Sequence, residues 1–125
     1  MPEPGAVATY AVVVEERHTA HAAGNPGVRV LSTPTLAHFC ALAARRAVAR
    51  GLAEDELAVP RRSTLAHLKA SPPGARIEAT ARVTAVNGRE VTLEVEARDG
   101  DGTAMTGTQL WAIEDRAALL AAADG

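Results

Sequence analysis

Apolar and polar residues alternate through the second half of the chain, as they do in strands that bury one face. From Arg76 to Val86 the apolar members of the alternation are Ile77, Ala79, Ala81, Val83 and Ala85. The alternation resumes from Glu90 to Arg98, where the apolar members are Val91, Leu93, Val95 and Ala97. Between the two runs, Asn87-Gly88 is the strongest short-range hairpin signal in the sequence. Asp99-Gly100-Asp101-Gly102 predicts a second turn, which leads into a last strand from Thr103 to Ile113. The pattern predicts an antiparallel meander.

Two more strands are predicted before this meander. The β-branched run from Ala6 to Glu15 favours an opening strand, and His18 to Val28 is a small, polar segment typical of a loop. Arg62 to Ala70 predicts another strand, which ends at the turn Ser71-Pro72-Pro73-Gly74. The alanine-rich stretch from Asp115 to Ala123 predicts a helical tail.

One long helix is predicted between the first two strands. Ser32 or Thr33 can cap its N-terminus, Pro34 suits its first turn, and Gly51 is a stop signal. The helical spacing is carried by Leu36, Phe39, Cys40, Ala43, Ala47 and Val48.

A long helix followed by an antiparallel meander with one apolar face has a simple packing solution. The sheet curls around the helix and buries its apolar face against it. We therefore expect an α+β protein with the hotdog fold, formed by one domain over residues 1–125, with a short C-terminal helix.

Composition and charge restrict the classes of function and of partner that the chain can have. Apolar residues make up 47% of the chain, but its only aromatic residues are Tyr10, Phe39 and Trp111. Such a lean core leaves apolar surface for a second subunit, so we expect an oligomer. The net charge of −2 and the interspersed charges argue against nucleic-acid binding. The start of the chain does not resemble a signal peptide, and no apolar run is long enough to cross a bilayer, which predicts a cytoplasmic protein without membrane contact.

His67 and Thr33 are the candidate catalytic residues. A histidine can take a proton from water near neutral pH, and N–H groups at a helix N-terminus can hold the oxygen of a polarised carbonyl. This pairing suits hydrolysis of an acyl ester or thioester. Two structural roles stay open from the residues alone: Thr33 as a plain helix cap, and His67 as a structural histidine on a strand.

From Ala8 to about Arg116 the chain resembles the fluoroacetyl-CoA thioesterase family of hotdog proteins. The matching segments are A-T-Y-A-V-V-V-E-E-R-H-T-A, L-S-T-P-T-L, A-H-L-K-A-S-P-P-G, V-N-G-R-E-V, A-R-D-G-D and G-T-Q-L-W-A-I. The resemblance implies hydrolysis of acyl-CoA thioesters by a Thr at the helix start, a Glu inside the helix and a His on the following strand. By position the Thr is Thr33 and the His is His67, whereas the Glu position holds Ala41.

Further differences concern the acyl pocket. An arginine that the family uses near the end of its last strand corresponds to Trp111, and a glycine on the His-bearing strand corresponds to Pro60. The segment that lids the fluoroacetate pocket with a Phe is shorter here, and residues 21–29 contain no aromatic residue. We therefore do not expect specificity for fluoroacetyl-CoA.

Thr33 and His67, the two residues that match the family pattern, are expected to have different roles. His67 acts as general base, and Thr33 orients water or substrate. Because Pro34 has no N–H, the carbonyl donors are expected at Thr35 and Leu36. His38 is the nearest candidate to replace the missing carboxylate.

Trp111 and four cationic side chains are the remaining predicted contacts with the substrate. Trp111 would form a larger apolar wall of the acyl pocket; its structural alternative is an ordinary core aromatic. Arginine and lysine side chains around the His67 strand could pair with coenzyme A phosphates, or simply form a solvated charged face; they are Arg61, Arg62, Lys69 and Arg76.

The predicted substrate is an acyl-CoA or acyl-carrier-protein thioester, bound by a homodimer or by a tetramer. Coenzyme A enters only as part of the substrate, and neither a metal nor a separate cofactor is predicted. Two alternatives remain: a non-catalytic module that binds acyl thioesters or another ligand, and a hotdog lyase, dehydratase or cyclase that uses His67 for proton abstraction. Release of free thiol separates hydrolysis from both.

Overall fold

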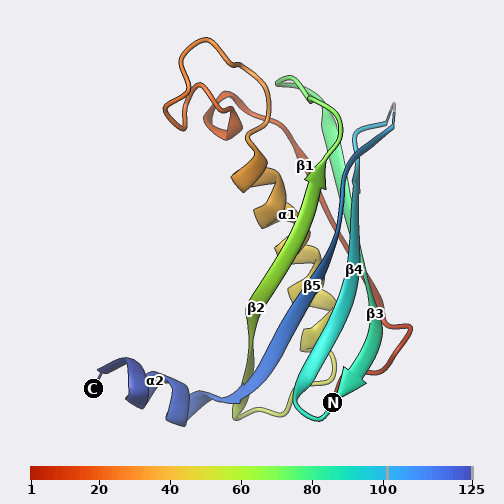
Figure 1. Cartoon of the computed structure of the whole chain (residues 1–125), viewed down its shortest axis with the longest axis vertical. Coiled ribbons are helices and arrows are strands. Elements are labelled where there is room, and N and C mark those ends of the chain that lie inside the picture. The colour runs from red at the N-terminus through yellow and green to blue at the C-terminus, as the bar shows by residue number, and fades with distance from the viewer. Residues whose placement is uncertain (101, 125) are drawn as a thin grey trace.

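The computed structural model describes residues 1–100 and 102–124 and contains five strands and one long helix (Figure 1). Asp101 of the predicted second turn and Gly125 lie outside the described residues. In chain order the elements are β1 (Val7–Val13), the 3-10 turn η1 (Glu16–His18), α1 (Thr33–Ala49), β2 (Glu56–His67), β3 (Arg76–Asn87), β4 (Glu90–Arg98), β5 (Thr103–Asp115) and α2 (Arg116–Asp124).

The five strands form one antiparallel sheet in the order β1-β3-β4-β5-β2, so β1 and β2 are its two edges. The sheet curves around α1, which lies along its concave side (Figure 1). This is the expected hotdog architecture. The helix packs most extensively on β3 and β1, less on β4 and β2, and least on β5.

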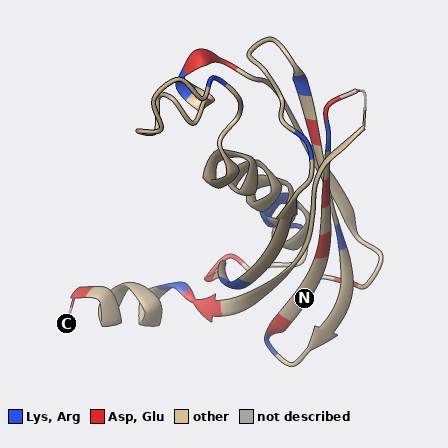
Figure 2. Ribbon diagram, turned by 45° about the horizontal axis from the view of Figure 1, so that its top comes forward, with Lys and Arg blue, Asp and Glu red and all other residues tan. Residues whose placement is uncertain are grey.

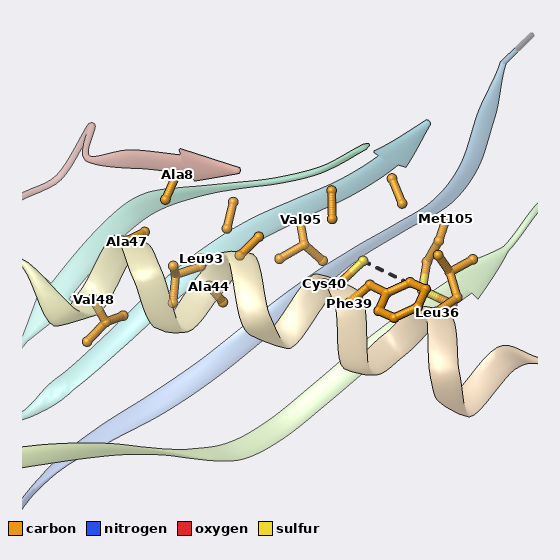
Figure 3. Close-up of a cluster of buried hydrophobic side chains, with 14 of the residues drawn as sticks. Ala8, Leu36, Phe39, Cys40, Ala44, Ala47, Val48, Leu93, Val95 and Met105 are labelled. Atoms are coloured by element: carbon orange, nitrogen blue, oxygen red, sulfur yellow. Dashed lines mark hydrogen bonds between the residues drawn. The ribbon is translucent and has the colours of Figure 1, made fainter. Parts of the chain in front are cut away.

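The predicted face of α1 is buried against the sheet. Figure 3 shows Leu36, Phe39 and Cys40 near one end of the helix and Ala44, Ala47 and Val48 near the other. Cys40 Sγ lies 3.9 Å from Met105 Sδ on β5, and burial raises the pKa of its thiol to about 11. The alanines among the buried residues of α1 are small, which lets the helix approach the sheet closely.

The strands β3 and β4 agree closely with the alternation in the sequence. In both, every second residue over most of the strand is buried toward α1, and the intervening residues are mostly exposed on the outer face. The hairpin is shifted by one residue from the prediction, because Asn87 pairs with Glu90 and the turn residues are Gly88 and Arg89. Gly88 has φ +62°, and Arg89 has a negative φ, which fits a II′ turn with glycine at its first central position.

The predicted strand Arg62–Ala70 is corrected at both ends, since β2 runs from Glu56 to His67. Its first residues pair with the end of β5, with Glu56 opposite Asp115. Pro60 interrupts the sequence pattern but is tolerated here because β2 is an edge strand with a bulge after Pro60. After His67 the chain leaves the sheet toward the turn formed by Pro72-Pro73-Gly74.

The outer surface and the C-terminal tail carry few features that select a partner. Acidic and basic residues are interspersed in Figure 2, without a continuous basic stripe among the described residues. The helix α2 buries no residue and extends away from the sheet (Figure 1). None of the described helices is long and apolar enough to span a membrane.

Candidate active site

Thr33 and His67, 34 residues apart in the sequence, meet where α1 begins and β2 ends. Thr33 Oγ1 lies 2.7 Å from His67 Nδ1, and His67 Nε2 lies 3.1 Å from the backbone carbonyl oxygen of Lys69. Thr33 is exposed and His67 is half-buried, so a substrate can reach both. We call this pair the dyad.

The two contacts of His67 define its hydrogen-bonding state. A carbonyl oxygen can only accept, so the contact with Lys69 requires a hydrogen on Nε2. In a neutral imidazole the other nitrogen, Nδ1, then carries a lone pair and accepts from the Thr33 hydroxyl. Nδ1 therefore faces the exposed side of the dyad as a base, ready to take a proton from a hydroxyl or from water.

The helix cap is Ser32, which leaves the Thr33 hydroxyl available for His67. Ser32 Oγ accepts from the Thr35 N–H at 3.2 Å and donates to Thr35 Oγ1 at 2.8 Å. Capping of α1 therefore does not use the Thr33 side chain, so the structural alternative of Thr33 as the cap is wrong. The extended backbone of Ser32 before the helix turns Thr33 outward at the first helical position.

The two backbone donors expected at Thr35 and Leu36 are already used by the helix. The Thr35 N–H donates to Ser32 Oγ, and the Leu36 N–H donates to the Ser32 carbonyl at 3.0 Å. Neither is free to bind a substrate carbonyl, which corrects that expectation. The Thr33 N–H, in contrast, has no acceptor within residues 1–100 and 102–124, and it stands at the positive end of the helix dipole.

The loop before α1 is tied to its surroundings by a buried histidine. His18, at the start of the segment expected to be a polar loop, is only 6% exposed, and its ring packs edge-on against Phe39 with 5.3 Å between centroids. Its Nδ1 accepts from the Glu15 N–H at 2.9 Å, and its carbonyl accepts from the Ser32 N–H at 3.0 Å. Burial, with a smaller effect from Arg17, lowers the pKa of His18. The sequence could not reveal this burial, because it depends on Phe39 from α1.

The cations considered for coenzyme A phosphates are largely occupied by carboxylates. Lys69 donates to Asp99, Arg61 pairs with Glu114 at 2.5 Å, and Arg76 lies 3.8 Å from Glu78. Lys69 also lies beyond the end of β2, so it is not part of the strand that carries His67.

The helix positions beyond Thr33 do not supply a second acid or base to the dyad. Ala37 and Ala41 follow Thr33 at intervals of one turn and are half-buried against the core. His38 is exposed and, at 100° per residue, lies about 140° around the helix from Thr33. The structure therefore does not bring His38 to the dyad.

Trp111 is far from the dyad in a single chain. It is 2% exposed, and its indole N–H donates to Gln109 Oε1 at 2.8 Å. Trp111 is opposite Pro60 in the sheet, whereas His67 is opposite Met105. These positions are separated by about 20 Å along β5, at about 3.3 Å per residue. The buried Gln109 beside Trp111 was not predicted, since a polar residue on a strand normally indicates its solvent face.

Gly107, also missed in the sequence, lets β2 lie close to β5 beside the dyad. Leu65, two residues before His67, is opposite Gly107. A Cβ on Gly107 would lie 2.3 Å from Leu65 Cδ2 and 2.5 Å from the Thr64 carbonyl oxygen. The absence of a side chain is therefore required for the observed position of β2.

Two hollows in the described part of the chain are lined by neither Thr33 nor His67. One of about 620 Å³ is on the outer face of the sheet, among charged and hydroxyl side chains of β3, β4 and β5. The dyad instead lies at the margin between α1 and the β2 edge. Within the described residues, no group of three or more His, Cys, Asp or Glu side chains is placed to hold a metal ion.

Comparison with known proteins shows the family of the chain. The model of the fluoroacetyl-CoA-specific thioesterase family matches residues 14–117. The chain belongs to this family. No curated protein sequence matches the chain significantly.

Solved structures with a similar fold agree with this family assignment. The fluoroacetyl-CoA thioesterase FlK is 25% identical with a TM-score of 0.89, over 98% of this chain and 95% of that one. A Thermus thermophilus hypothetical protein, described as a thioesterase superfamily member, is 26% identical with a TM-score of 0.89, over 97% and 90%. A hot-dog-like protein from Thermanaerovibrio acidaminovorans, 22% identical with a TM-score of 0.88 over 96% and 89%, shares the fold.

Proposed function

We propose that the protein hydrolyses the thioester of a small acyl group carried by coenzyme A or by an acyl-carrier protein. The observation that supports this most directly is the 2.7 Å contact between Thr33 Oγ1 and His67 Nδ1, with the opposite ring nitrogen held by a backbone carbonyl. In the Nε2–H tautomer, this arrangement places the Nδ1 lone pair beside an exposed hydroxyl at a helix N-terminus. Membership of a thioesterase family supports the same chemistry.

The reaction follows from these groups. The thioester carbonyl lies over the start of α1, where the Thr33 N–H and the helix dipole stabilise the oxyanion. A water molecule bound at the Thr33 hydroxyl gives one proton to that hydroxyl, which passes its own proton to His67 Nδ1, while the water oxygen bonds to the carbonyl carbon. The C–S bond then breaks, and the proton on His67 passes to the departing thiolate. The products are a carboxylic acid and a free thiol, and the general base contributes roughly 10²–10⁴-fold to the rate.

We further propose a homodimer in which the β2 edges of two copies pair. All residues from Pro60 to Thr64 are exposed, so neither α1 nor another element of the chain covers the middle of β2. Leu68, just beyond the strand, is 60% exposed and extends the edge with an apolar side chain. A long open edge is normally covered in a native protein. Pairing with a second copy provides that cover.

In one register of this dimer, Trp111 comes near the dyad of the second copy. If two β2 strands pair antiparallel about an axis between Ser63 and Thr64, residue 60 of one copy is opposite residue 67 of the other. Trp111 of one copy is then two strands from His67 of the other, about 10 Å away at about 4.8 Å per strand. The predicted acyl wall therefore requires a second copy. With Trp111 in that wall, we expect larger acyl groups to be preferred over fluoroacetyl.

Free-thiol release from a panel of acyl-CoAs, and from the same acyl groups on pantetheine and a carrier protein, tests the hydrolase. We expect His67→Ala to lower kcat by roughly 10²–10⁴-fold with folding retained. The matched comparison is His38→Ala, which removes an exposed histidine of α1 that does not reach the dyad. Equal loss in both variants, or full activity in His67→Ala, would contradict the proposed role of His67.

A non-catalytic acyl-thioester module is the second candidate, because Ala41 replaces the in-helix carboxylate that the family resemblance predicts. Such a module would saturate with an acyl thioester by calorimetry without releasing thiol. A lyase, dehydratase or cyclase would alter the acyl chain and leave the thioester intact, which mass spectrometry of the acyl-CoA detects.

A further inference from the structure

Asp99 is a buried carboxylate behind the dyad that the proposed reaction does not use. It follows the end of β4, and its side chain is only 2% exposed. One carboxylate oxygen, Oδ2, accepts from Lys69 Nζ at 2.5 Å and from Ser71 Oγ at 2.9 Å. Both donors belong to the short segment between the end of β2 and the Pro72-Pro73-Gly74 turn.

The backbone carbonyls of the same two residues hold the two halves of the dyad. The Lys69 carbonyl accepts from His67 Nε2 at 3.1 Å. The Ser71 carbonyl accepts from the Leu31 N–H at 2.8 Å, one residue before the Ser32 cap and two before Thr33. Asp99 therefore anchors, through side chains, the two residues whose carbonyls hold the histidine and the start of α1.

This segment has little other support from regular structure. Residues 68–75 belong to no helix or strand, although the Leu68 N–H still donates to the Ala104 carbonyl on β5. Hydrogen bonds to an ionised carboxylate are stronger than those between neutral groups, particularly away from water. The Asp99 contacts are thus suited to fixing the carbonyls of Lys69 and Ser71.

We propose that Asp99 is a positioning residue for the Thr33–His67 dyad, an inference that rests on the proposed function. Its role is to keep the Lys69 carbonyl on His67 Nε2, so that the imidazole retains the tautomer with a basic Nδ1, and to hold the start of α1 at the matching distance. The two bonds that Asp99 Oδ2 accepts, from Lys69 Nζ and from Ser71 Oγ, carry this role. Ala41 stands where the family resemblance places a carboxylate. In this chain, the carboxylate that orients the histidine is therefore Asp99, which follows the end of β4.

The test compares Asp99→Ala, Asp99→Asn and the control Glu94→Gln, an exposed acid on β4. Asparagine keeps an acceptor oxygen of the same shape, and alanine removes it. In thiol-release assays we expect Asp99→Ala to lower kcat by up to about 10²-fold with KM little changed, since a misplaced catalytic group costs about that much. Asp99→Asn, which keeps an acceptor oxygen but loses the charge, is expected to recover part of the loss, and Glu94→Gln to match wild type.

Nitrogen-15 NMR of the His67 imidazole provides a readout that does not depend on turnover. Wild type and Asp99→Asn should show the Nε2–H tautomer, whereas Asp99→Ala should show a mixture of the two. If wild type releases no thiol, the proposed hydrolase fails, but the tautomer comparison still decides the role of Asp99.

Two results would overturn the positioning role. One is an Asp99→Ala protein that keeps the wild-type tautomer, because the Lys69 carbonyl would then stay on His67 Nε2 without Asp99. The other is a loss of kcat in Asp99→Asn as large as in Asp99→Ala. Should Asp99→Ala fail to fold, Ser71→Ala removes one of the two anchors and leaves the backbone; an unchanged tautomer and kcat in that variant would equally reject the proposal.

Discussion

Replacing Gly107 with alanine tests whether close contact between β2 and β5 sets the geometry of the dyad. The new methyl would lie 2.5 Å from the Thr64 carbonyl oxygen, where ordinary contact begins at 3.4 Å. Leu65 can rotate its side chain away, but the carbonyl moves only with the strand. Relief of the clash therefore displaces β2 by about 0.9 Å near Thr64, and such overpacking costs about 1–3 kcal/mol.

The displacement acts directly on the dyad, because His67 is three residues from Thr64 on the same edge strand. If it is transmitted in full, the Thr33–His67 distance increases from 2.7 Å to about 3.6 Å, beyond hydrogen-bonding range. We expect Tm to fall by about 4–10 °C and kcat by up to about 10²-fold.

Circular dichroism melting and the thiol-release assay measure both effects. Gly102→Ala is the control, since its methyl would meet only Lys69 Cδ at 3.9 Å and its φ is not positive. A Gly107→Ala protein that melts and turns over like wild type would refute the claim that this contact positions His67.

Three further predictions concern the cap, a buried histidine and the acyl wall. Ser32→Ala removes the side-chain acceptor of the Thr35 N–H and should lower the free energy of unfolding by about 1 kcal/mol in urea titrations, whereas Ser32→Asp should not. The pKa of His18 is lowered in the folded state from 6.5, so the unfolded chain binds more protons; stability should be complete above about pH 6.5 and decline as the pH falls through that value. Urea unfolding should show a weaker decline in His18→Asn, and an equal decline would assign it to other groups. Trp111→Leu should shift the ratio of kcat/KM values toward smaller acyl groups, and wild type that prefers fluoroacetyl-CoA over larger acyl-CoAs would contradict the proposed wall.

The sequence predicted β3, β4 and α1 to within about a residue because each has a regular period that one buried face imposes. The start of β2 was missed because Pro60 interrupts its pattern, and only the pairing of Glu56 with Asp115 shows that the strand continues through it. An edge position that tolerates proline is a property of the assembled sheet, which local sequence does not encode.

For the site, the sequence indicated Thr33 and His67 but not the bonds that hold them. Ser32 and Thr33 are both plausible caps in the sequence, and the backbone angles at Ser32 settle which one acts. Asp99 occurs in a run of aspartates and glycines that is typical of a turn. Its contact with Ser71, 28 residues away, arises only when β4 and the segment after β2 come together.

The burial of Cys40 gives the protein a practical chemical property. It is the only cysteine of the chain, it has no exposed surface, and its raised pKa keeps it protonated. Because the thiolate is the reactive form, the native protein should give almost no background with thiol reagents. Coenzyme A release can therefore be followed even when enzyme and substrate are present in equal amounts, which gives access to a single turnover. Because Cys40 does not react, a Ser63→Cys variant would carry its only reactive thiol on the β2 edge. Formation of a covalent dimer by this variant would show how two copies meet.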